Sequence, residues 1–147
     1  MIIAMNKVDR YKKVIKEGRS FLRHFTRKLD GAYNCQLVAE VVHNYLKTGK
    51  KDKAGIGYSP FVVKPDLKFA TERTIMSKLK RSASHLVIYG ERADKSAHWF
   101  IAANVNDTIY AIDADNGGTN PEAFLTYVKN QGFKKYQCTK EFRISPG

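Results

Sequence analysis

AHWFIAANVNDTIYAID, residues 97–113, decides the fold, because it has the pattern of two strands joined by a two-residue turn. Asn106-Asp107 separates the two apolar arms, and such a pair favours a tight β-hairpin. With that turn, His98 lies opposite Asp115. Side chains alternate along a strand, so His98, Asp113 and Asp115 share one face. The hairpin therefore predicts an imidazole and two carboxylates at one end of an apolar sheet face.

Helical periodicity precedes this hairpin. Apolar residues recur every three or four positions over residues 7–29 and 34–46, which predicts two helices separated by Asp30-Gly31. A third helix is predicted over 67–79, with Phe69 on its buried side, and Pro121 is expected to start a last one. Further extended segments are predicted at 58–63, 85–89 and 134–144. Helices followed by a mostly antiparallel sheet predict an α+β fold, and residues 1–147 contain no repeat or linker that would divide one domain.

The composition excludes several classes of protein. No apolar run approaches the roughly 18 residues of a membrane span, and the apolar start of the chain is too short for a signal peptide. Two cysteines cannot form a disulfide framework or a four-thiolate zinc site. A single bridge between Cys35 and Cys138 is the alternative to Cys138 as a buried residue of a late strand. His24, His43 and His85 lack a second ligand, so neither a metal nor another cofactor is expected.

The positive charge points to an anionic partner. The net charge is +12 with a pI near 9.7, and nine Lys and Arg lie in residues 7–28 against Asp9 and Glu17. A field of this sign favours nucleic acid, an acidic protein or an anionic membrane surface, although charge clusters are commonly just solvated faces. Two further basic clusters follow, and the first of them is the candidate polyanion-binding segment: Lys47, Lys50, Lys51 and Lys53, then Lys78, Lys80 and Arg81.

Cys35 is the candidate nucleophile. It opens the predicted second helix, directly after Asn34, and a helix N-terminus and a nearby imidazole both favour a thiolate. The order of helix and sheet favours a contact with His98, because the helix must bury its apolar stripe on one sheet face. Asp113, or alternatively Asp115, would then hold the imidazole. Each residue also has a structural interpretation: a buried core cysteine, a hydrogen-bonded core histidine, and aspartates that bind loop amides.

These motifs resemble the papain-like fold toxins of bacterial polymorphic toxin and contact-dependent growth inhibition systems. Members show Asn-Cys opening a helix, His-x-Phe on a later strand and Asp ending the next strand. The matching residues here are Asn34-Cys35, His98-Trp99-Phe100 and Asp113, within residues 30–116. The resemblance implies a papain-like cysteine-hydrolase-type fold with N-terminal helices packed on an antiparallel sheet. Cys35 would be the nucleophile, His98 the general base and acid, and Asp113 the residue that orients it.

The same resemblance implies a biological setting. The domain would be delivered as part of a larger secreted toxin, act in the cytoplasm of the target cell, and be neutralised by a cognate immunity protein, which we expect to be acidic. Papain-like enzymes place a glutamine for the oxyanion hole shortly before the cysteine, and no glutamine precedes Cys35 here. Asn34, Gln36 or the Cys35 backbone N–H would have to serve instead.

Three functions compete at the level of the sequence. The first is hydrolysis of amide bonds in a target protein, by proteolysis or by glutamine deamidation, through a thioester on Cys35. The second is cleavage of RNA, such as tRNA, with His98 as general base and basic residues at the phosphate. The third is a non-enzymatic basic module, in which aromatic residues stack on bases beside the lysines: Tyr11, Tyr33, Tyr45, Tyr58 and Trp99.

Overall fold

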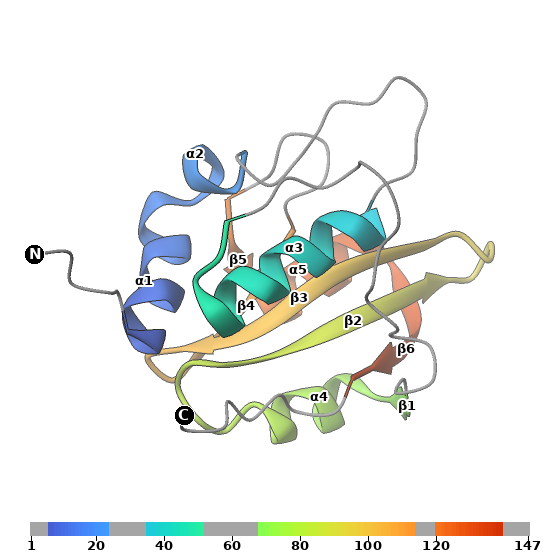
Figure 1. The fold of residues 1–147 in the computed structure, drawn as a ribbon. Coiled ribbons are helices and arrows are strands. Elements are labelled where there is room, and N and C mark those ends of the chain that lie inside the picture. The colour runs from blue at the N-terminus through green and yellow to red at the C-terminus, as the bar shows by residue number, and fades with distance from the viewer. Residues whose placement is uncertain (1–5, 24–34, 52–67, 114–119, 140–147) are drawn as a thin grey trace, which may run out of the picture.

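The computed structural model describes residues 6–23, 35–51, 68–113 and 120–139, and over these residues the chain is α+β. Six strands form one antiparallel sheet in the order β1-β6-β2-β3-β4-β5 (Figure 1). The strands are β1 (Lys68–Ala70), β2 (Ser84–Arg92), β3 (Ala97–Val105), β4 (Thr108–Ile112), β5 (Glu122–Ala123) and β6 (Phe133–Cys138). The helices are α1 (Lys7–Glu17), α2 (Arg19–Leu22), α3 (Cys35–Thr48), α4 (Glu72–Lys78) and α5 (Phe124–Gln131).

The hairpin of β3 and β4 has the predicted turn and register. Asn106 and Asp107 have φ angles of 53° and 67°, the left-handed backbone that a type I′ turn requires at both central positions. Ile101 pairs with Ile112, and Ala102 with Ala111, as the two-residue turn predicts. The hairpin therefore fixes which side chains share a face.

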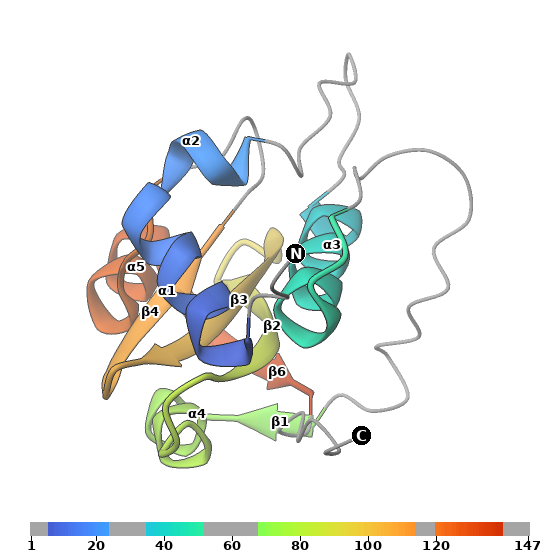
Figure 2. The ribbon, with the colours of Figure 1, turned by 60° about the vertical axis from the view of Figure 1, so that its left-hand side comes forward.

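The two faces of the sheet carry separate cores. Trp99, Ile101 and Ala103 of β3 pack with the buried residues of α1, α2 and α3. Phe100 and Ala102, which alternate with them, pack with the buried residues of α4 and α5. Figure 2 shows α3 on one side of the sheet and α5 on the other. The α3 face and the α5 face are named accordingly below.

The first predicted helix is interrupted at Gly18. Within the described part of residues 7–29, α1 ends at Glu17, Gly18 has a φ of 54°, and α2 begins at Arg19. The Asn120 Oδ1 accepts a hydrogen bond from the Arg19 N–H at 2.9 Å, and it lies 2.6 Å from where a Cβ on Gly18 would stand. A glycine is therefore required at this break, both for its backbone angle and for its lack of a side chain.

Two other predicted helices begin later than expected. Within 67–79, residues Lys68–Ala70 form β1, and α4 starts only after Thr71, whose hydroxyl caps it by accepting from the Thr74 N–H. Phe69 was expected on a buried side and is 80% exposed. Pro121 precedes the short strand β5, and α5 starts at Phe124. The segment 58–63 lies outside the described residues.

Among the described residues, no helix combines the length and apolar character needed to cross a bilayer.

Candidate functional site

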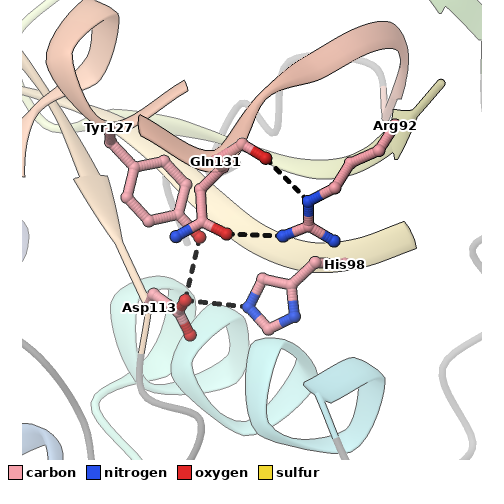
Figure 3. A network of polar contacts seen from close by, with 5 residues as sticks. All are labelled: Arg92, His98, Asp113, Tyr127 and Gln131. Atoms are coloured by element: carbon pink, nitrogen blue, oxygen red, sulfur yellow. Dashed lines mark hydrogen bonds and ion pairs between the residues drawn. The ribbon is translucent and has the colours of Figure 1, made fainter. Parts of the chain in front are cut away.

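His98 and Asp113 meet at one end of the β3–β4 hairpin. The His98 Nε2–H donates a hydrogen bond to Asp113 Oδ2 at 2.8 Å (Figure 3). The His98 side chain is 16% exposed and that of Asp113 is 13% exposed. His98 is the second residue of β3 and Asp113 directly follows β4, so the antiparallel pairing brings them together. This carboxylate–imidazole pair fixes one tautomer of His98 and stabilises its protonated form.

Tyr127 is a third member of this hydrogen-bonded network, and no pattern in the sequence predicts its role. It lies on α5, and its hydroxyl donates to the same Asp113 Oδ2 at 2.8 Å (Figure 3). Burial is the main cause that raises the Tyr127 pKa far above its ordinary value, and the charge of Asp113 adds to it. Tyr127 therefore remains a donor throughout the physiological pH range.

Arg92, the last residue of β2, links the end of α5 to the sheet through hydrogen bonds next to this network. Its Nε donates to the Gln131 backbone carbonyl and its Nη2 to Gln131 Oε1, both at 2.6 Å (Figure 3). Its guanidinium also lies 4.9 Å from the centre of the Phe133 ring. These contacts hold the last turn of α5, which directly follows the turn that carries Tyr127, against β2 and β6.

Gly90 leaves the space in which the Phe133 ring packs. Gly90 pairs with His98 across β2 and β3. A Cβ at Gly90 would lie 2.7–2.9 Å from three atoms of the Phe133 ring, closer than packed carbons approach. The ring itself stacks on Phe100 at a centroid distance of 5.6 Å. The aromatic layer next to His98 therefore depends on the absence of a side chain at Gly90.

Cys35 is the first residue of α3, and its side chain lies outside the described part of the structure. The N-terminus of α3 lies at the end of the sheet where β3 begins (Figures 1 and 2). The apolar stripe of α3, however, packs on the α3 face, whereas His98 alternates to the α5 face with Phe100. A contact between the thiol and the imidazole would thus form around the end of β3 and not across one sheet face.

Several other predicted site residues also lie outside the described residues: Asn34, Lys53, Asp115 and the side chain of Gln36.

The described candidate lysines lie at the other end of α3. Lys47, Lys50 and Lys51 are exposed, about 20 Å from the helix N-terminus by the rise of an α-helix. Arg10 of α1 donates to the backbone carbonyls of Leu46 and Lys47 at 3.1–3.2 Å. The basic residues of α1 and those after α3, separate in the sequence, therefore form one basic surface.

The aromatic residues proposed for base stacking are core residues where the structure describes them. Tyr11, Tyr45 and Trp99 are 1%, 3% and 8% exposed. Tyr33 and Tyr58 lie outside the described residues. This burial removes the stacking platform that the non-enzymatic binding hypothesis assigned to the three described residues.

A second polar cluster lies in the core on the α3 face of the sheet. The Tyr11 hydroxyl is hydrogen-bonded to His85 Nδ1, and His85 Nε2 lies 2.7 Å from His43 Nδ1. Both histidines are buried, at 1% and 3% exposed. Burial lowers the pKa of His43 to about 4 and that of His85 well below its ordinary value. Both imidazoles are therefore neutral at pH 7.

No group of three or more His, Cys, Asp or Glu side chains in the described ranges is arranged to hold a metal ion. Cys138 is a free, fully buried thiol on β6, as expected for a core residue of a late strand, and burial raises its pKa.

A comparison of the chain with protein-family models, curated proteins and solved structures finds no match.

Proposed function

We propose that this chain is a cysteine hydrolase that cleaves amide bonds of a target protein, as a protease or a glutamine deamidase. The observation that carries the proposal is the His98–Asp113 hydrogen bond at the end of the sheet where α3 begins with Cys35. A thiol at a helix N-terminus and an imidazole held by a carboxylate are the two parts that a thiolate nucleophile requires.

Each residue has a defined part in this reaction. His98 accepts the thiol proton on Nδ1, since Nε2 is bound to Asp113. The Cys35 thiolate attacks the substrate carbonyl, and the imidazolium then protonates the leaving amine or ammonia. Water, deprotonated by His98, hydrolyses the thioester and releases the thiol. Asp113 keeps the imidazole oriented and stabilises its charged form.

The toxin setting belongs to the same proposal. A papain-like fold delivered within a larger secreted protein would act in the cytoplasm of the target cell, and the producing cell would need an immunity protein. The net charge of +12 favours an acidic immunity protein, because opposite charges accelerate and orient association.

The reactivity of Cys35 tests the proposal without knowledge of the substrate. Alkylation by iodoacetamide, followed by peptide mass spectrometry from pH 5 to 10, should give Cys35 a midpoint at least about one unit below the 8.5 of a free thiol. His98→Gln should move the midpoint back toward that value and lower the rate at pH 6.5 by about tenfold. Asp113→Asn should act in the same direction.

Cys138 is the internal control, because its buried thiol reacts only if the protein unfolds. If Cys35 titrates identically in the wild type and in a folded His98→Gln variant, the thiol and imidazole are not coupled and the proposal is wrong.

Cleavage of RNA is a second candidate, favoured by two observations. The His98–Asp113 pair lies on the α5 face without any need for α3, and the net charge of +12 favours a polyanionic substrate. In this reaction His98 takes the proton of a 2′-hydroxyl, which attacks the adjacent phosphorus and expels the 5′-oxygen.

Incubation with total cellular RNA separates the two candidates. For a ribonuclease, the wild type and Cys35→Ala should give the same discrete fragments, and His98→Ala should give none. Raising the salt concentration should suppress the cleavage. Intact RNA with the wild-type protein would reject this candidate and leave amide hydrolysis.

A further inference from the structure

One carboxylate oxygen of Asp113 accepts hydrogen bonds from two donors. His98 Nε2–H and the Tyr127 hydroxyl both bind Oδ2, each at 2.8 Å. A second hydrogen bond to a carboxylate oxygen reduces the negative charge that is left to stabilise a neighbouring cation, here the protonated imidazole of His98. The strength of the His98–Asp113 pair therefore depends on the Tyr127 hydroxyl.

The position of that hydroxyl is set by packing. Tyr127 is 3% exposed, and its ring lies 4.7 Å from the Phe100 ring and 6.3 Å from the Phe133 ring, centre to centre. The Arg92–Gln131 contacts hold the same helix against the sheet, as Figure 3 shows. A buried phenol in a packed aromatic layer has little freedom to leave its acceptor, so the charge on Asp113 Oδ2 is shared between the hydroxyl and the imidazole.

We propose that Tyr127 is a positioning residue that competes with His98 for Asp113 and so lets His98 lose its proton at a lower pH than the His98–Asp113 pair alone would allow. A group that both accepts and returns a proton works best when it titrates near the operating pH, and a fully committed carboxylate would hold the imidazolium too firmly. The benefit of this effect for catalysis rests on the proposed function, whereas the effect of Tyr127 on the pH at which His98 loses its proton does not.

Removing the Tyr127 hydroxyl tests whether it lowers the pH at which His98 loses its proton. In Tyr127→Phe, we expect the His98 titration, followed by NMR of the imidazole in the intact protein, to move upward by about 0.5 to 1 pH unit. The tautomer with the proton on Nε2 should persist, because Asp113 remains. An unchanged or lower titration midpoint in a folded Tyr127→Phe variant would overturn the proposal.

Tyr136→Phe is the matched control. Tyr136 is also buried in the same core, at 5% exposed, but its hydroxyl donates to Glu72 Oε1 at 2.8 Å and not to Asp113. It should lose stability similarly and leave His98 unaffected, and an equal shift in both variants would reject the proposal. Repeating the titration in Cys35→Ala separates this test from the cysteine mechanism: a shift that persists there supports the role of Tyr127 even if Cys35 is not the nucleophile.

Discussion

Acidification from pH 7 to pH 5 is expected to destabilise the fold by about 2 kcal/mol through His43 alone, with His85 acting in the same direction. The folded-state pKa of His43 is about 4, below the ordinary value of 6.5. Between these values the unfolded chain binds a proton that the folded chain does not. Stability is therefore unaffected above pH 6.5, and it falls as the pH drops toward 4.

The surroundings of the two histidines explain why they resist protonation. His85 and His43 face each other through ring nitrogens 2.7 Å apart, so two imidazolium ions would oppose hydrogen to hydrogen. After burial and the other histidine, Lys7 and Lys47 are the further causes that lower the pKa of His85. Lys47 also lowers the pKa of His43, and Glu40 and the Tyr11 hydroxyl are further buried polar groups on α3 and α1.

Urea unfolding at pH 7, 6 and 5 measures this effect. The comparison is a variant that replaces the three hydrogen-bonded residues by apolar ones, Tyr11→Phe/His43→Leu/His85→Leu, and so removes both titrating imidazoles together with the hydroxyl that binds one of them. Its stability should fall less between pH 7 and 5 than that of the wild type. Equal losses in both proteins would contradict the prediction, as would imidazolium signals from either histidine in the folded wild type at pH 5.

Gly90→Ala is expected to destabilise the protein by about 3 kcal/mol, although it adds one methyl group in a strand. The new Cβ would lie 2.7–2.9 Å from the Phe133 ring. The ring cannot retreat freely, because it stacks on Phe100 with an interplanar angle of 2° and lies under the Arg92 guanidinium. Alanine is otherwise preferred to glycine in a strand, so the sign of the effect reports the steric conflict.

A double-mutant cycle measures the conflict directly. Phe133→Leu alone should destabilise the protein, but Gly90→Ala should cost much less in the Phe133→Leu background than in the wild type. Thermal or urea unfolding of the four proteins gives the coupling free energy. Additive effects of the two substitutions would show that the close approach is not the cause.

The sequence predicted the hairpin correctly because its evidence is local. Strand alternation and the Asn106-Asp107 pair together allow one register, and that register places His98 and Asp113 on one face. The break at Gly18 was not predicted, because the apolar spacing of a helix continues through it. The break depends on Asn120, which is about a hundred positions away in the sequence.

The candidate site was predictable in part for the same reason. The pairing of His98 with Asp113 follows from strand geometry, whereas Tyr127 reaches Asp113 only because α5 packs at one angle on the sheet. A tyrosine on the apolar stripe of a helix has no signal that distinguishes it from a core residue. The sequence favoured packing of the helix of Cys35 on the face that carries His98, but α3 covers the other face, and the pattern does not distinguish the two because both faces of the hairpin are apolar.

The network around Asp113 comes from one uninterrupted segment of chain, from Arg92 to Gln131. The two hydrogen bonds to Asp113 join residues only 14 and 15 positions apart, so each of them closes a short loop. Short loops cost little entropy to close, and contacts of this kind form early in folding. We expect the His98–Asp113 pair and Tyr127 to assemble as one cooperative unit, and α3, with Cys35, to join it from outside that unit.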